Sequence, residues 1–337
     1  MNRAVLRLLW VFMALTAASN FLSGQAPPEN RMQQEKWGQC KGGDPAQAIT
    51  ACSELIGAGT MTDDALNKAE AFYSRGRAYA HKRDYDRAIQ DYTQAARLKP
   101  GDPNVFDGLG LAYWHKGDYD RAGENYDQAL RLRPLDDIAL VGRGLVYWAE
   151  GSHDRAIQDY DQALSLKPNS ADAFYDRGLA YESKGDHTRA IEDYSHALRL
   201  KPSDADSFYQ RGLAYRQGGD FENAIQDYSQ ALRLNPHNFA AFYNRGLAYS
   251  QEGDFDRAIQ DYDQALLINP KFALGYRDRS IACARKGAYR RAIADWGRWL
   301  WLRHGPLGIS IRLFILILAI GLGVALKRFG RRAEVRP

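Results

Sequence analysis

The sequence is poor in the residues and motifs that carry most enzyme chemistry. Its 337 residues include only three cysteines and seven histidines. It holds no G-x-S-x-G, H-E-x-x-H or G-x-x-x-x-G-K motif and no glycine-rich dinucleotide loop. The formal net charge is only +4, and no basic stripe of the kind that binds nucleic acid is present. We therefore expect a non-enzymatic protein with no cofactor, no metal site and no nucleic-acid partner.

The N-terminus has the composition of a secretory signal. Arg3 and Arg7 flank the start of an apolar run from Leu8 to Ala18, and small and polar residues follow it. This order is typical of a signal peptide, which we expect to occupy residues 1–26. An uncleaved anchor helix is the alternative, although the apolar run is short for a membrane span.

A second apolar segment lies near the C-terminus. Residues 307–326 contain a single Arg and are long enough to cross a bilayer. Tryptophans precede the segment and basic residues follow it, as at the two surfaces of a membrane: Trp296, Trp299 and Trp301, then Lys327, Arg328, Arg331 and Arg332. We expect a transmembrane helix over 307–326 and a basic tail over 327–337. A buried core helix is the alternative.

Two of the cysteines bracket a short helical pattern. Cys40 and Cys52 could form a disulfide in an oxidising compartment. A metal site would need more ligands than the stretch between them supplies. Cys283 is left over, and buried packing is expected for it.

The middle of the chain consists of seven copies of one sequence repeat. Residues 71–100 return as 105–134, and further copies end at Pro168, Pro202, Pro236 and Pro270. The period is 34, and the units, here called repeats one to seven, are 69–102, 103–136, 137–170, 171–204, 205–238, 239–272 and a degenerate 273–306. Each repeat shows the pattern of two helices, with Gly185 and Asp186 typical of the turn between them. Strand signals are absent.

This pattern resembles the tetratricopeptide repeat (TPR). In repeat four the signature places are held by Phe174, Gly178, Tyr181, Ala190, Tyr194, Ala197 and Pro202. Gln47–Ile56 looks like the second helix of a preceding partial repeat, so residues 27–68 would form an N-terminal capping segment. The resemblance implies an all-α fold, a right-handed superhelical α-solenoid whose first helices line a concave groove.

The consensus sequence of the repeats, "RGLAY…GDxxRAIxDYxQAL", and the helix between the two cysteines resemble those of bacterial cell-envelope TPR proteins. The resemblance implies a protein of the bacterial cell envelope. With a cleaved signal peptide and a single transmembrane helix over 307–326, we expect a protein of the inner membrane whose repeats lie in the periplasm and whose C-terminal tail lies in the cytoplasm.

One arginine recurs in the first helix of six repeats, and an Asp follows each of them sixteen residues later. The pairs are Arg75 with Asp91, Arg143 with Asp159, Arg177 with Asp193, Arg211 with Asp227, Arg245 with Asp261, and Arg279 with Asp295. Repeat two has Leu109 and Asn125 at these places, so both members change together. Losing one partner would leave a costly lone charge, which predicts structural ion pairs within each hairpin. A pair with a neighbouring repeat and an arginine ladder facing an anionic ligand are the alternatives.

The residue positions that the resemblance assigns to the concave groove vary more between repeats than the recurring signature positions do. The candidate partner-binding residues are Tyr73, Trp114, Trp148, Tyr175, Leu179, Tyr209, Leu213, Tyr243 and Leu247. Large aromatic side chains with polar tips suit the anchoring of a peptide or a sugar chain. Packing between adjacent first helices is the alternative for the Tyr and Leu residues.

The expected function is a protein-interaction scaffold that binds a peptide or partner protein in the groove and is held at the membrane by the C-terminal helix. The alternative is a carbohydrate-binding or assembly role in peptidoglycan or exopolysaccharide export.

Overall fold

The computed structural model describes residues 28–57 and 65–305, which form helices joined by short turns and no strand. None of the helices in these ranges is both long enough and apolar enough to cross a membrane. The expected signal peptide (1–26), transmembrane helix (307–326) and basic tail (327–337) lie outside the described residues.

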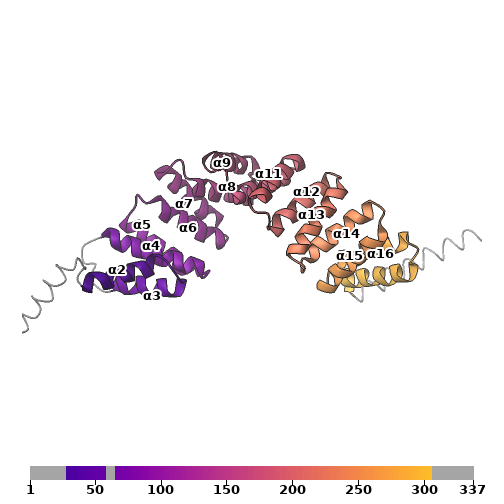
Figure 1. Cartoon of the computed structure of the whole chain (residues 1–337), viewed down its shortest axis with the longest axis horizontal. Helices are drawn as coiled ribbons and strands as arrows, with labels where there is room; N and C mark the ends of the chain where they lie inside the picture. Colours follow the sequence, from indigo (N-terminus) through magenta and orange to yellow (C-terminus); the bar gives the residue numbers. More distant parts are fainter. Residues whose placement is uncertain (1–27, 58–64, 306–337) are drawn as a thin grey trace, which may run out of the picture. The chain divides into compact units, whose positions relative to one another are not determined.

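The helices form hairpins, which pack in chain order within residues 28–168 and within residues 169–305 (Figure 1). The first helices of the hairpins are α2 (Pro28–Lys41), α4 (Ala65–His81), α6 (Pro103–His115), α8 (Asp137–Ala149), α10 (Ala171–Ser183), α12 (Ala205–Gln217), α14 (Phe239–Gln251) and α16 (Ala273–Arg285). The second helices are α3 (Pro45–Gly57), α5 (Tyr85–Leu98), α7 (Tyr119–Leu132), α9 (His153–Leu166), α11 (His187–Leu200), α13 (Phe221–Leu234), α15 (Phe255–Ile268) and a last helix over 289–305. The expected all-α architecture of stacked helix hairpins is confirmed for these residues.

The turn inside each hairpin follows from two residue types. Gly185 ends α10 with a φ of 76°, a conformation that glycine adopts without strain. Asp186 then caps α11, because its Oδ1 accepts a hydrogen bond of 3.1 Å from the backbone N–H of Arg189. The same Asp cap begins α5, α7, α13 and α15.

Small residues allow the two helices of a hairpin to approach closely. A Cβ atom at Gly178 would lie 2.7 Å from the ring of Tyr194, so only glycine fits there. Ala190 and Tyr194 are completely buried. Close packing of this kind stabilises each hairpin.

The N-terminal hairpin is more complete than the sequence suggests. Only its second helix was expected, but α2 precedes it and packs on both α3 and α4. Helix α2 is polar and has little apolar periodicity, so the sequence pattern gives no sign of it. Trp37 and Cys40 supply its contact with the core around Leu55 and Ala71.

The chain divides into two compact units, called here the N-terminal unit, up to residue 168, and the C-terminal unit, from residue 169. In the N-terminal unit α4 contacts α6 and α6 contacts α8, and in the C-terminal unit α10, α12, α14 and α16 make the same series of contacts. Each unit is therefore a stack in which the first helices lie side by side.

Repeat one departs from the turn chemistry of the others. Arg83 takes the place that Gly117 and its counterparts hold, and it has a φ of 59°. Since a side chain is disfavoured in this left-handed conformation, Arg83→Gly should stabilise the protein by about 0.5–1 kcal/mol in urea unfolding. Lys82→Gly, one residue earlier where no positive φ occurs, is the matched control and should give no such gain. Equal effects of the two changes would contradict this explanation.

Candidate functional site on the first-helix face

The predicted groove residues occupy the fifth, ninth and twelfth places of their repeats, which lie on one side of the first helix. We call this surface the first-helix face. Tyr73, Trp114 and Trp148 lie on it in the N-terminal unit, and the others lie on α10, α12 and α14 in the C-terminal unit: Tyr175, Leu179, Tyr209, Leu213, Tyr243 and Leu247. All of them are half-buried. A partner could therefore touch only part of each side chain.

The tyrosines of the C-terminal unit connect successive repeats. Tyr209 Oη accepts a hydrogen bond of 3.1 Å from Asn244 Nδ2, and Tyr243 Oη donates one of 2.6 Å to Asp278 Oδ2. Tyr175 is hydrogen-bonded in the same way to Gln210. These tyrosines thus serve the packing between adjacent first helices, which was the alternative role expected for them.

The hydrogen-bond partners of the tyrosines were missed in the sequence. They occupy the sixth place of repeats five, six and seven, which is polar where the preceding repeat has Tyr at the fifth place. Burial raises the pKa of Tyr175 and of Tyr209, so both phenols stay neutral and act as hydrogen-bonding groups.

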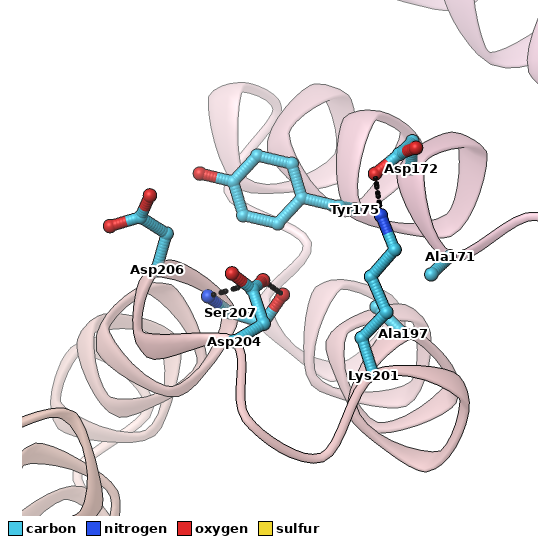
Figure 2. A pocket seen from close by; sticks show the side chains of 8 residues that line it. All are labelled: Ala171, Asp172, Tyr175, Ala197, Lys201, Asp204, Asp206 and Ser207. Carbon is cyan, nitrogen blue, oxygen red and sulfur yellow. Dashed lines mark hydrogen bonds and ion pairs between the residues drawn. The ribbon is translucent and has the colours of Figure 1, made fainter. Parts of the chain in front are cut away.

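A small acidic cleft opens between the N-terminal parts of α10 and α12, beside Tyr175. Its volume is about 190 Å³, and Asp172, Asp204 and Asp206 line it together with Lys201. Lys201 Nζ donates a hydrogen bond of 2.6 Å to Asp172 Oδ1, while Asp204 caps α12 by accepting from the backbone of Ser207. Figure 2 shows the Tyr175 hydroxyl directed away from Lys201. Three carboxylates against one ammonium group favour a cationic ligand group here.

The first-helix face of the N-terminal unit is more apolar. Leu111 is 46% exposed and Ile138 is 60% exposed, although neither was among the predicted site residues. Trp114 packs against Tyr119 with ring centroids 4.9 Å apart. Trp114 and Trp148 are half-buried, so a stacked sugar could reach only part of each ring.

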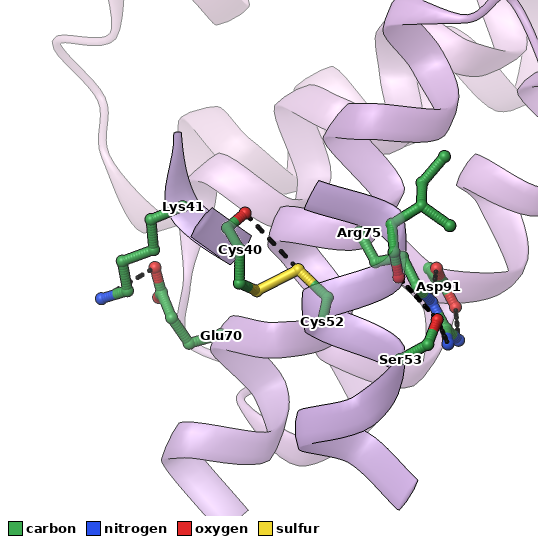
Figure 3. Close-up of a disulfide and its surroundings, with 8 residues drawn as sticks. Cys40, Lys41, Cys52, Ser53, Glu70, Arg75 and Asp91 are labelled. Carbon is green, nitrogen blue, oxygen red and sulfur yellow. Dashed lines mark hydrogen bonds and ion pairs between the residues drawn. A yellow bond between two sulfur atoms is a disulfide. The ribbon is translucent and has the colours of Figure 1, made fainter. Parts of the chain in front are cut away.

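A disulfide closes the N-terminal end of the stack (Figure 3). It joins Cys40, near the end of α2, to Cys52 in α3, and both side chains are buried. The pair expected from the sequence is therefore present. No group of three or more metal-ligating side chains occurs in residues 28–57 and 65–305. Closing a loop of this size stabilises a fold by on the order of 3 kcal/mol.

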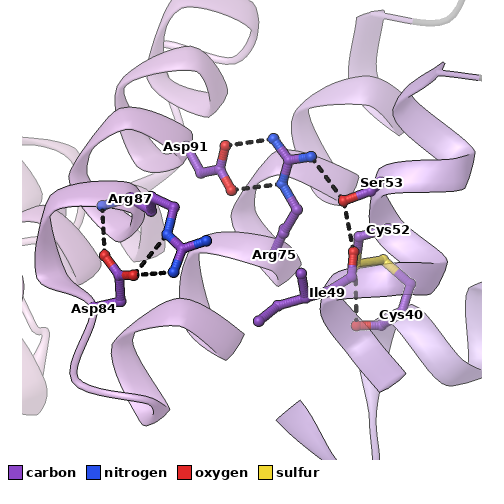
Figure 4. Close-up of polar contacts among 8 residues, drawn as sticks. All are labelled: Cys40, Ile49, Cys52, Ser53, Arg75, Asp84, Arg87 and Asp91. Carbon is purple, nitrogen blue, oxygen red and sulfur yellow. Dashed lines mark hydrogen bonds and ion pairs between the residues drawn. A yellow bond between two sulfur atoms is a disulfide. The ribbon is translucent and has the colours of Figure 1, made fainter. Parts of the chain in front are cut away.

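The recurrent arginine is tied to both its own repeat and the preceding one. Arg75 Nε and Nη2 donate to the two carboxylate oxygens of Asp91 at 2.8 Å each, and Nη1 donates to Ser53 Oγ at 3.0 Å (Figure 4). All six predicted pairs are present in the structure: Arg75 with Asp91, Arg143 with Asp159, Arg177 with Asp193, Arg211 with Asp227, Arg245 with Asp261, and Arg279 with Asp295. We call this arrangement the arginine staple.

The contact to the preceding repeat recurs along the chain. The acceptors of Nη1 are Asp127 for Arg143, Ser195 for Arg211, Ser229 for Arg245 and Asp263 for Arg279, at 2.6–2.9 Å. The side chains of these six arginines are only 13–23% exposed. Their burial argues against a ladder of arginines facing a ligand. The ion pair within the hairpin is present for all six arginines, and a second ion pair with the preceding repeat is present for Arg143 and Arg279.

Repeat two shows what replaces the staple. Leu109 is buried and apolar, and Asn125 Nδ2 donates to the backbone oxygen of Arg121 at 2.7 Å instead. No carboxylate is therefore left alone at that place in the hairpin. In repeat one, hydrogen bonding to Asp91 raises the pKa of Arg75, which expresses how strongly the pair favours the charged form.

Repeat two buries a carboxylate, that of Asp107, on the first-helix face. Asp107 is 8% exposed, and its Oδ1 has no hydrogen-bond partner among the described residues. Its Oδ2 lies 3.4 Å from Arg133 Nη2, and Arg133 Nε donates to Asp136 at 2.6 Å. Burial and the nearby Asp136 raise the pKa of Asp107 from 3.8 to about 7.

This pKa predicts a pH-dependent stability. Folded Asp107 keeps a proton that the unfolded chain has released, so its contribution to stability should fall as pH rises from about 4 to about 7. Asp107→Asn removes the effect, and its Tm should exceed that of the natural protein by an amount that grows over this window. The difference should reach a few degrees, since 1 kcal/mol corresponds to about 2–4 °C in a domain of this size.

The exposed Asp120 of α7 supplies the control for losing one negative charge, as Asp120→Asn. A Tm difference for Asp107→Asn that stays constant from pH 4 to pH 8 would refute the assignment.

The comparisons with known proteins agree with this architecture. Models described as tetratricopeptide repeat match residues 69–102, 108–171, 144–207 and 239–272, and a TPR repeat model matches 212–253. Together these matches cover more than half of the chain. The DnaJ homolog subfamily C member 3 homolog of Dictyostelium discoideum is 38% identical over 63 residues, which are 19% of this chain and only 11% of that protein.

Solved structures share the fold. The structure of Pseudomonas aeruginosa pilF has a TM-score of 0.57 at 18% identity and covers 64% of this chain and 98% of its own. A tetratricopeptide repeat protein from Parabacteroides merdae has a TM-score of 0.52 at 19% identity, with coverage of 72% and 96%. The period, the hairpin geometry and the family matches together assign the chain to the tetratricopeptide repeat family.

Proposed function

We propose that this chain is a non-catalytic scaffold that binds a peptide or a partner protein on its first-helix face. The family to which it belongs typically serves in protein–protein interaction. The observation that carries the proposal is the exposure of Leu111 and Ile138 on that face, at 46% and 60%. Ile138 stands at the second place of its repeat, seven residues before the ninth place, and therefore lies on the same side of the first helix. Large apolar side chains exposed on one face favour a docking surface.

The chemistry of the first-helix face differs between the units: it favours apolar residues in a peptide that binds the N-terminal unit and basic residues in a peptide that binds the C-terminal unit. In the N-terminal unit Leu111 and Ile138 would bury apolar side chains of the partner. In the C-terminal unit the acidic cleft beside Tyr175 would accept a Lys or Arg side chain, which could also lie against the tyrosine ring. The carbohydrate-binding alternative is less well supported, because Trp114 and Trp148 are half-buried.

We place the scaffold at the membrane surface of a bacterial cell envelope. The disulfide between Cys40 and Cys52 supports an oxidising compartment, because such bonds persist there and are rare in the cytosol. The apolar sequence over 307–326 supports attachment to the membrane.

Selection of displayed peptides on the full chain tests the binding proposal. The enriched sequences should include apolar peptides and peptides with Lys or Arg. Leu111→Glu with Ile138→Glu should weaken binding of the apolar peptides by roughly tenfold or more, because a central apolar contact is commonly worth over 1 kcal/mol. Asp172→Asn with Asp206→Asn should weaken only those peptides that carry the basic residue.

Matched changes outside the first-helix face serve as controls. Leu166→Glu alters a partly exposed leucine of α9, and Glu192→Gln with Glu222→Gln removes two exposed charges from α11 and α13. These variants should bind as the natural protein does. Equal losses in the control and test variants, or enrichment of no peptide while glycan fragments quench tryptophan fluorescence, would overturn the proposal.

A further inference from the structure

The last repeat ends the stack with an apolar face that nothing in the described structure covers. Tyr289, Ile293 and Trp296 are four and three residues apart on the helix over 289–305, so they share one side of it. Their exposed fractions are 67%, 72% and 43%. Together with Trp301, which is 44% exposed, we call them the end face.

In repeat six the positions equivalent to Ile293 and Trp296 are buried against repeat seven. Ile259 stands where Ile293 does and is 8% exposed, and Tyr262 stands where Trp296 does and is fully buried. The end face is therefore a stacking surface without its neighbour. The opposite end of the chain differs, because polar α2 closes it. Solenoids need such polar caps to stay soluble, so an open apolar end favours an occupant.

The charge around the end face indicates which occupant fits. Arg290, Arg298 and Arg303 are exposed on the same helix. The guanidinium of Arg298 lies 4.7 Å from the ring centroid of Trp301. The acidic Asp295 of this helix is buried in its pair with Arg279. Exposed aromatic and apolar side chains beside uncompensated arginines are typical of helices that bind anionic lipid.

The same charges disfavour a second copy of the chain. Two end faces packed on each other would bring the arginines of both copies together, and like charges repel at short range. A head-to-tail contact would set the apolar end face against polar α2. Neither arrangement would both bury the apolar side chains of the end face and compensate its arginines, whereas the interface of an anionic bilayer would do both.

We propose that the end face lies on an anionic lipid surface, with the helix over 289–305 parallel to the membrane plane. This inference rests on the proposed membrane location. The apolar sequence begins at residue 307, two residues after the last described residue of this helix. An upright helix would keep Trp301 near the bilayer but lift Ile293 about 18 Å above residue 305, at about 1.5 Å per residue. A helix parallel to the membrane brings both side chains to the lipid.

Site-directed spin labelling of the full chain distinguishes the two orientations. Nitroxides are placed on Ile293→Cys and Trp301→Cys, with Leu135→Cys as the control, since Leu135 is 67% exposed and belongs to the N-terminal unit. The natural cysteines do not interfere, because Cys283 is buried and the other two are bonded. The protein is reconstituted in vesicles of phosphatidylglycerol with phosphatidylcholine, and in phosphatidylcholine alone.

The proposal predicts that the labels at 293 and 301 both gain contact with lipid-dissolved oxygen and lose contact with an aqueous nickel chelate. The label at 135 should stay aqueous, and the label at 293 should be more water-accessible without the anionic lipid. A lipid-exposed 301 with an aqueous 293 would overturn the inference and leave the membrane location standing. Dipolar broadening between copies at 293 would overturn it in favour of self-association. Failure of the chain to float with vesicles would overturn the membrane location itself, and the peptide-binding proposal is tested independently.

Discussion

The arginine staple is the interaction on which the rest of the structure depends. A guanidinium that is only about one-fifth exposed must keep its partners, because an unpaired buried charge costs several kcal/mol. Arg211 meets this need by bonding Asp227 in its own hairpin and Ser195 in the preceding repeat. The same side chain thus fixes the angle within a hairpin and the contact between hairpins. Repeat two, with Leu109, relies on apolar packing instead.

The staple leaves the first-helix face free to vary. The recurrent arginine and contacts of the Gly178–Tyr194 type set the orientation of the helices in each hairpin. The exposed residues of the first-helix face can therefore change without loss of the fold. The two units use this freedom differently. The N-terminal unit exposes Leu111 and Ile138, whereas the C-terminal unit gathers carboxylates beside Tyr175. We infer that binding chemistry resides in these differences.

The helix hairpins and the arginine–aspartate pairs could be predicted from the sequence. The period of 34 residues indicates the hairpins, and the joint change at Leu109 and Asn125 indicates that the two positions contact each other. Helix α2 could not be predicted, since it is held by a few contacts around Cys40 rather than by an apolar stripe. The role of Tyr209 also needed coordinates, because its bond to Asn244 joins different repeats. Exposure of Ile293 depends on a missing neighbour, which its own local sequence does not reveal.

A double-mutant cycle on Arg211 and Asp227 tests the staple most directly. Arg211→Leu alone leaves a buried carboxylate and should lower the free energy of unfolding by roughly 3–5 kcal/mol. Arg211→Leu with Asp227→Asn copies repeat two, and we predict that this double variant is more stable than the Arg211→Leu single variant in urea unfolding. Strictly additive losses, with the double variant the least stable of all, would contradict the account.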